Sequence, residues 1–193
     1  MATAGKSGIT ANTPKSIAFG AGTIHKNLKY TTNTWNFDAS IIGATSGGSK
    51  LTITPEITDI EVDGAWVKVK GLTKKTGETA TMEINFVELS EEIIKAATLG
   101  ASGTSADTTY NLIESKADIV TGDYFENIAF VGMTLEGKKI IVVMDNALCT
   151  SGMELEGKNK EAGVVALTFE CHAAIDSDLD KLPWHIYYPK PEV

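Results

Sequence analysis

Cysteine, basic charge and long apolar runs are all scarce in this sequence. Only two cysteines occur, Cys149 and Cys171, which is too few for a disulfide-stapled secreted module. The longest uninterrupted apolar run, Ile140 to Met144, is far shorter than the roughly 20 residues that span a bilayer. Residues 1–16 contain no apolar segment of the kind found in a secretory signal. The sequence therefore predicts a soluble, cytoplasmic protein without a membrane span.

Basic residues are outnumbered by acidic ones. The 193 residues carry 17 Lys and Arg against 25 Asp and Glu, a formal net charge of −8. Proteins that bind nucleic acid tightly usually place basic side chains against phosphates, so this balance argues against DNA binding by the average surface. A surface of this sign would let DNA pass without holding it. The length and the 42% hydrophobic content suit one compact domain over residues 1–193.

Apolar and polar residues alternate with a period of two along much of the chain, which predicts half-buried strands. An Asp63-Gly64 pair joins the alternating residues 57–62 to the alternating residues 65–70. Asp-Gly favours a type I′ hairpin turn, because that turn needs positive φ at both central residues. The wholly apolar run 140–144 suits a central strand covered on both sides. The expected alternating strands are 57–62, 65–70, 82–86, 127–135, 165–172 and 184–188.

One helix is predicted after Ser90. Ser90 suits its N-cap, two glutamates follow in the first turn, and Gly100 follows its end. Ile93 and Ala97 belong to an apolar stripe that would cover one end or face of the sheets. The polar segments 43–50 and 100–109, rich in Gly, Ser and Thr, are expected to form surface loops.

Together these elements predict a mainly β fold. It would contain two packed antiparallel sheets, as a β-sandwich or partly open barrel, with one flanking α-helix. Such a fold leaves strand edges, which must be paired or blunted. Few charges or prolines interrupt the expected strands, which indicates that their edges meet neighbouring molecules.

No combination of residues predicts a catalytic, metal or cofactor site. His25, His172 and His185 are isolated from one another and suit surface or rim positions, whereas a metal centre needs closely spaced ligands. Cys171 and His172 are neighbours on a strand, so their side chains point to opposite faces and cannot form a nucleophile–base pair. We therefore expect a non-enzymatic protein with no cofactor and no metal.

Three further patterns admit both a ligand-binding and a plainer interpretation. The alternating aspartates of residues 176–180 lack the glycine and the later glutamate of a calcium loop, so a solvated acidic connection suits them better. Gly20-Ala21-Gly22 is too short for a dinucleotide fingerprint and suits a turn before a strand. Trp66, Lys68 and Lys70 share a strand face that could stack single-stranded nucleic acid, although the net charge favours an ordinary wet face.

The order of several segments along the chain resembles a known family. Residues 60–72 combine an acidic-Asp-Gly turn with a Lys-Gly-Leu ending, and residues 19–24 place Gly-x-Gly at the start of a strand. The segments 127–132, 140–146, 161–172 and 183–188 then follow in order. In this order they resemble the major tail (tail tube) proteins of long-tailed bacteriophages, over most of residues 15–190. Trp66 departs from the family, which more often has a smaller or charged residue there.

The resemblance implies the phage tail tube fold and a structural role. Subunits of that family form hexameric rings that stack into a hollow tube, through which DNA passes during ejection without specific binding. It also implies a flexible N-terminal arm over residues 1–15 and a long ring-stacking loop over residues 30–50. Trp35 and Phe37 would anchor that loop, although both suit core positions of an ordinary strand as well.

The implied partners are further copies of the chain, the tape measure protein, the tail terminator and a baseplate or tip initiator. No membrane is involved, and the implied location is the virion tail, after assembly in the cytoplasm of the bacterial host. Contractile tails and type VI secretion use the same fold, so the fold alone does not choose among these machines.

Two other functions remain open from the sequence. A β-sandwich module that binds a receptor or a carbohydrate on a virion or other particle would present Trp35, Trp66 or Trp184 in a concave groove. A small metal-dependent barrel enzyme would hold metal in stoichiometric amount. Exposure of the three tryptophans and the grouping of metal-ligating residues would separate these alternatives.

Overall fold

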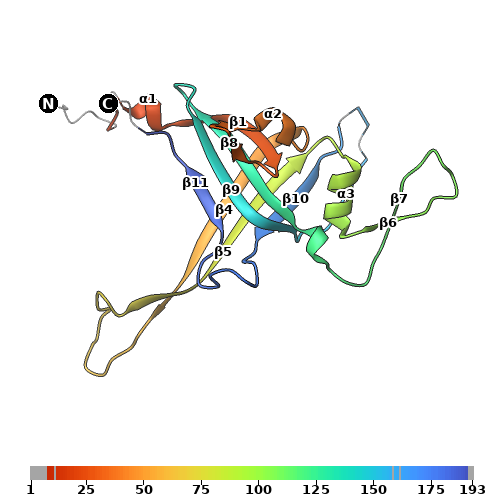
Figure 1. The fold of residues 1–193 in the computed structure, drawn as a ribbon. Coiled ribbons are helices and arrows are strands. Elements are labelled where there is room, and N and C mark those ends of the chain that lie inside the picture. The colour runs from red at the N-terminus through yellow and green to blue at the C-terminus, as the bar shows by residue number, and fades with distance from the viewer. Residues whose placement is uncertain (1–7, 11, 158, 161, 191–193) are drawn as a thin grey trace.

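The computed structural model describes residues 8–10, 12–157, 159–160 and 162–190. It is mainly β, with antiparallel strands that stop short of a closed barrel and a helix at one side, which confirms the predicted fold class (Figure 1). Residues 1–7 and 11 of the expected N-terminal arm lie outside the described residues, and α1 (Thr13–Ser16) lies at the end of that segment. Within the described ranges no helix is long and apolar enough to cross a membrane.

Seven strands form the main sheet. Six of them follow one hydrogen-bonded path, and the seventh, β11 (Trp184–Tyr187), pairs with β9 beside that path. All the pairings are antiparallel. In spatial order the path is β1 (Ala18–Lys26), β8 (Phe125–Thr134), β9 (Lys139–Cys149), β10 (Val165–Cys171), β5 (Thr73–Phe86) and β4 (Thr45–Asp59).

The sheet divides at β9. Along one edge, β9 pairs with β8 over residues 139–147. Along its other edge it pairs with β11 over residues 141–144 and with β10 over residues 147–149. The division produces one layer containing β1, β8 and β11 and a second layer containing β10, β5 and β4.

The two layers face each other across the main hydrophobic core. Ile128 enters it from β8 in the first layer, Met144 enters it from β9, and Met82 and Phe169 enter it from the second layer; each is completely buried. The inward positions of β5 and β10 alternate strictly, as their sequences predicted. The fully buried side chains of these two strands are Ala80, Met82, Ile84, Phe86, Val165, Leu167 and Phe169.

The two ends of the strand path approach each other without joining into a ladder. β1 and β4 contact one another. The N–H of Ile42 donates to the carbonyl oxygen of Ile24 at 3.2 Å, and His25 forms a single bridge with Ile41. This side of the molecule therefore has the form of a partly open barrel.

The helix α3 (Glu91–Thr98) covers an end of the core. The Ser90 hydroxyl accepts a hydrogen bond from the N–H of Ile93 at 3.3 Å, which satisfies one of the free donors of the first turn. Leu99 ends the helix in the left-handed region, at φ 50°. Ile93 and Ala97 are buried against the main core, so the apolar stripe of the helix faces inward.

Small elements complete the structure. A short hairpin of β2 (Tyr30–Thr31) and β3 (Thr34–Trp35) leads into α2 (Phe37–Ser40). Another pairs β6 (Ala101–Gly103) with β7 (Leu112–Glu114), and the 3-10 helix η1 (Thr121–Asp123) precedes β8. Of the segment 100–109, predicted to be a loop, residues 101–103 therefore form a strand.

The prediction of a tight hairpin at Asp63 and Gly64 is wrong. β4 ends at Asp59 and β5 begins at Thr73, so residues 60–72 form a long loop between the paired ends of these strands. Asp63 and Gly64 lie in a turn closed by the N–H of Ala65 and the carbonyl of Val62, but only Gly64 has positive φ. A type I′ turn needs both, so this turn cannot connect strands 57–62 and 65–70 directly.

The turn with positive φ at both central residues lies instead between β2 and β3. Thr32 and Asn33 have φ values of 53° and 63°. A β-branched residue is unfavourable there, and the cross-strand contact of Tyr30 with Trp35, at 5.2 Å between ring centroids, offsets this strain.

Two segments predicted to be loops contain regular structure. Residues 45–50 of the expected loop 43–50 belong to β4, where an irregularity of pairing between Thr45 and Ser49 accommodates Gly47 and Gly48 at positive φ. The expected long loop 30–50 comprises β2, β3, α2 and the start of β4. Gly20 and Gly22 likewise lie in a bulge within β1 rather than in a turn before it.

Two glycines at positive φ provide a test of this packing. A Cβ at Gly22 would collide with the Phe130 ring and lie 2.9 Å from the Val131 carbonyl oxygen, whereas a Cβ at Gly64 would meet nothing within 4 Å. We expect Gly64→Ala to lower the free energy of unfolding by about 1 kcal/mol through backbone strain alone. Gly22→Ala should cost at least about 2 kcal/mol. Urea denaturation measures both, and equal losses would contradict the bulge in β1.

Candidate assembly surface

The histidines do not assemble a metal site. His25 is buried in β1, His172 is half-buried after β10, and His185 is exposed on β11. Within the described ranges, no group of three or more His, Cys, Asp or Glu side chains could hold a metal ion. The expectation of a surface or rim position is wrong for His25, whose ring nitrogens contact two hydroxyls, those of Thr23 at 2.7 Å and Ser40 at 2.8 Å.

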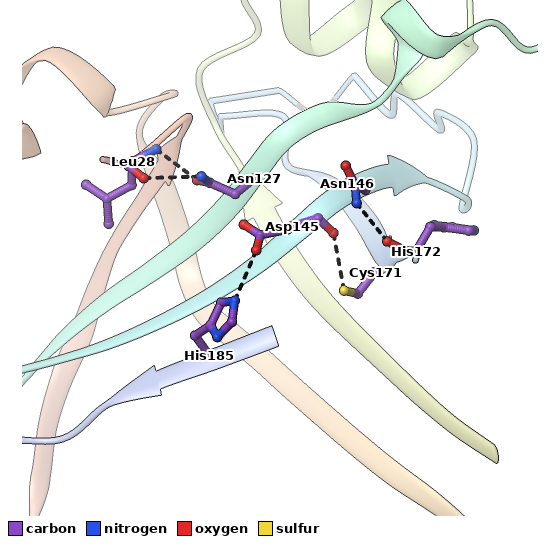
Figure 2. Close-up of polar contacts among 7 residues, drawn as sticks. All are labelled: Leu28, Asn127, Asp145, Asn146, Cys171, His172 and His185. Atoms are coloured by element: carbon purple, nitrogen blue, oxygen red, sulfur yellow. Dashed lines mark hydrogen bonds and ion pairs between the residues drawn. The ribbon is translucent and has the colours of Figure 1, made fainter. Parts of the chain in front are cut away.

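A polar cluster on β9 ties three strands together (Figure 2). The Asp145 carboxylate lies 3.2 Å from Nε2 of His185 on β11, and its backbone carbonyl accepts from the Cys171 thiol at 3.2 Å. The Asn146 amide donates to the carbonyl of His172 at 3.1 Å. Asp145 is only partly accessible, and burial raises the pKa of its carboxyl despite the nearby imidazole. The contacts join β9 to β10 and β11, where the sheet divides.

A second contact in Figure 2 fixes the chain that leaves β1. The amide of Asn127, buried on β8, accepts from the N–H of Leu28 at 2.8 Å and donates to the Leu28 carbonyl at 3.2 Å. A side-chain amide that satisfies both backbone groups of one residue substitutes for a strand partner. It positions the chain just before the β2–β3 hairpin.

Neither thiol in this region is a nucleophile. Burial raises the pKa of Cys171 to about 12, with the Asp145 carboxylate as a further cause. Burial also raises the pKa of Cys149, which lies in the core at the end of β9. Because the thiolate is the reactive form, burial disfavours reaction of both groups at neutral pH.

A long arm projects from the sheet body (Figure 1). We define the arm as residues 54–78 and its tip as the loop of residues 60–72. The Trp66 side chain at the tip is 97% exposed and Val67 is 78% exposed. An apolar cluster of this size on a projecting loop is typical of a surface that another molecule covers. The exposed large apolar residues of the arm are Ile57, Ile60, Val62, Trp66, Val67 and Val69.

The strands of the arm have only each other as partners. β10 pairs with β5 over residues 81–86, so residues 73–80 lie beyond that ladder. β4 pairs with residues 73–80 of β5, and within the described chain it pairs with no other strand. Both edges of this two-stranded ribbon are therefore open, and isolated ribbons of this kind are marginally stable in water.

Ion pairs fasten the arm internally. Lys68 of the tip lies 2.5 Å from the Asp59 carboxylate, which also accepts from the Thr73 hydroxyl at 2.8 Å. These contacts lower the pKa of Asp59, and the same ion pair raises the pKa of Lys68. Lys75 pairs with Glu78 at 2.8 Å, and Glu78 also accepts from the indole N–H of Trp184 at 3.1 Å. Because these pairs are exposed to solvent, they add only a small contribution to the backbone ladder of the arm.

An aromatic hollow lies on the body, next to α2. It has a volume of about 620 Å³, within the range of about 300–1,000 Å³ typical of ligand pockets. The Trp35 ring contacts Phe37 at 6.3 Å and Tyr187 of β11 at 4.9 Å between centroids. The Lys139 ammonium lies 4.5 Å from the centre of the Phe37 ring. The residues that line the hollow include Trp35, Phe37, Asp38, Ala39, Ile41 and Lys139.

The structure separates the residues proposed from the sequence into three places. Trp35 and Phe37 are half-buried and pack on a second small core of β1, β8 and β9. Ser90, Ile93 and Ala97 belong to α3. Asp63 and Gly64 lie at the tip of the arm. The arm was not predicted from the sequence. A signal for it was that apolar and polar residues alternate over residues 57–70, with no further apolar segment in the sequence to cover them.

Comparisons with known proteins found few likenesses. No family and no curated protein matches the chain. Among solved structures, the fold is similar to a chain of a structure described as the virion of a native gene transfer agent (GTA) particle. The TM-score is 0.42 and the sequence identity is 14%, over 80% of this chain and 92% of that chain.

Acid should destabilise the fold through His25. Desolvation by burial lowers the pKa of His25 below its ordinary 6.5, although the Phe37 backbone and the Asp38 charge act in the opposite direction. Between these two pKa values the unfolded chain binds a proton that the folded chain does not. The His25 contribution to stability is therefore complete above pH 6.5 and falls as the pH decreases through that window.

Urea denaturation at about pH 7.5 and about pH 5.5 measures this effect. His25→Gln, which is uncharged at both values, should be less stable at neutral pH but should lose less stability on acidification than the natural chain. An identical loss in both proteins would show that His25 is not the responsible group.

Thiol labelling tests the two buried cysteines. Because burial raises both pKa values, neither Cys149 nor Cys171 should react measurably with iodoacetamide at neutral pH in the folded protein, whereas both should react in urea. Mass spectrometry counts the added groups. Rapid labelling of Cys171 without denaturant would contradict its placement in the core.

Proposed function

We propose that the chain is a structural subunit of a bacteriophage tail tube. Its copies form hexameric rings that stack around a channel, and DNA passes through that channel during ejection. The observation that carries the proposal is the arm, which is a ribbon with two open edges and an exposed apolar tip. Such an element requires a partner, and a second copy of the chain is the partner that self-assembly supplies.

The sequence order that resembles tail tube proteins supports the same proposal, and residues 60–72, which form the tip, belong to the resembling segments.

The chain has two different surfaces through which copies could contact each other, the tip of the arm and the α2 region. In Figure 1 the tip of the arm and the α2 region lie at opposite ends of the molecule. A contact between two different surfaces is heterologous, so it produces a ring when it closes and a filament when it does not.

The charge of the chain suits passage of DNA. The net charge is −8, and all 17 basic residues are lysines. Without arginine the chain lacks the planar, bidentate group that binds phosphates most specifically. A channel lined by such subunits would have few strong phosphate contacts to retard DNA. Other tail proteins, among them a tape measure, a terminator and an initiator, would then be its further partners in the virion tail.

A receptor- or carbohydrate-binding module remains the second candidate, because Trp66 is almost completely exposed. Exposed indoles stack on sugar rings as well as on proteins. Trp35 and Trp184 are half-buried, however, and the Trp184 indole is held by Glu78, so these two do not share a groove with Trp66. Binding to a glycan array would favour this candidate.

Electron microscopy tests the assembly. We expect the concentrated protein, or the particles that contain it, to show a tube of stacked six-fold rings. Replacing residues 60–72 by Asn-Gly should leave a folded monomer that forms no tube, because Asp59 and Thr73 are already paired and a two-residue turn can join them.

The matched control shortens the other long hairpin. Replacing residues 104–111 by Asn-Gly joins the paired residues Gly103 and Leu112 in the same way and should leave the tubes intact. Location of the chain away from the tail shaft of assembled particles would defeat the proposal.

A further inference from the structure

An exposed indole and an aromatic hollow occur on the same chain. Trp66 projects from the tip with 97% of its side chain exposed. The hollow beside α2, of about 620 Å³, is lined by Trp35, Phe37 and Ile41. A tryptophan with its large rigid ring is the side chain that most often anchors a protein interface, and it does so in a pocket that excludes water.

We propose that Trp66 of one copy inserts into the aromatic hollow of a second copy. This inference rests on the proposed function, because it identifies the contact that joins successive copies. The arm cannot reach its own hollow, since the tip and α2 lie at opposite ends of the molecule (Figure 1). The occupant is therefore the arm of another copy, in a head-to-tail arrangement.

The hollow has the chemistry that an indole requires. Phe37 stacks on Trp35 and carries the Lys139 ammonium over its ring, so the apolar surface for an incoming ring comes from Trp35 and from Ile41, which is 49% exposed at the rim. Trp35 is itself held by Tyr187 from β11, so the wall of the hollow is rigid before the partner arrives. Trp35 and Phe37, expected from the sequence to anchor a stacking loop, thus form the receiving side of the contact.

Charges around the two surfaces are complementary. The exposed carboxylate of Asp38 lies at the hollow, and Lys70 follows Trp66 in the tip. The hollow also contains a positive charge, on Lys139, and the tip contains a negative charge, on Asp63, which precedes Trp66. A docked tip with Lys70 toward Asp38 and Asp63 toward Lys139 would form two attractive pairs, which would favour that register of the contact.

Cross-linking between two variants tests the contact directly. One preparation carries Ala65→Cys, next to Trp66 in the tip, and the other carries Ala39→Cys, in α2 beside the hollow. Because the natural cysteines are buried, only the introduced thiols are available. Mixing the two under assembly conditions and oxidising should yield a disulfide-linked dimer containing one chain of each kind. Ser102→Cys, on the β6–β7 hairpin, replaces Ala39→Cys in the control and should give no such dimer.

Assembly strength provides a second readout. Trp66→Ala should raise the concentration needed for assembly by about thirtyfold or more, and Val67→Ala, its exposed neighbour, should change it less than about threefold. Asp38→Lys should weaken assembly, and adding Lys70→Glu to it should restore part of the loss. Urea denaturation of each monomer controls for folding, because all four side chains are exposed.

The outcomes separate this inference from the proposed function. Tubes without the mixed disulfide, and without the charge rescue, would overturn the Trp66 contact while the tail tube proposal stands. Absence of tubes and rings from both the concentrated protein and the particles would defeat both. If Trp66→Ala abolished glycan binding and left assembly unchanged, the tip would be a carbohydrate surface and the inference would be wrong.

Discussion

The structure depends on the two edges of β9. A strand offers two rows of backbone donors and acceptors, and β9 gives one row to β8 and divides the other between β11 and β10. The division forces the sheet into two layers, and the layers enclose the core that contains Met82, Met144 and Phe169. Asp145 and Asn146 lie at the point of division, where their side chains and backbone bind the strands that diverge. The arm extends from the second layer, and the hollow is supported by Tyr187 of β11, so the junction at β9 positions both.

The body and the arm differ in what stabilises them. The body buries alternate side chains of β5 and β10 completely, so it gains the full hydrophobic contribution of those positions. The arm continues the β4–β5 ladder beyond any covering layer, and its backbone bonds, its ion pairs and its turns at Gly64 and Gly71 define its shape. A protein that needed only to fold would gain little from such an extension. Its exposed apolar tip has a physical explanation when another molecule covers it.

Sequence patterns predicted the elements whose environment is local. Period-two alternation identified β10 and the inner part of β5, because one covered face is sufficient to produce it. The expected runs 127–135 and 184–188 correspond to β8 and β11, and Ser90 located the start of α3 through its cap. The same alternation misled over residues 57–70, where strand-like sequence lacks any covering layer within the chain. The aromatic hollow had no local signal, because it joins Trp35 to Tyr187 of β11, which lies at the other end of the sequence. His25 was assigned to the surface because nothing near it in sequence reveals that Ser40 closes over its ring.

The slenderness of the arm has a mechanical consequence. A ribbon of two strands twists and bends far more easily than a layered sheet, since no second layer resists the motion. Where successive copies are joined through the ends of such ribbons, the joint deforms and the bodies stay rigid. An assembly of this design would curve under load by flexing many narrow connectors a little, and each copy would keep its own core intact.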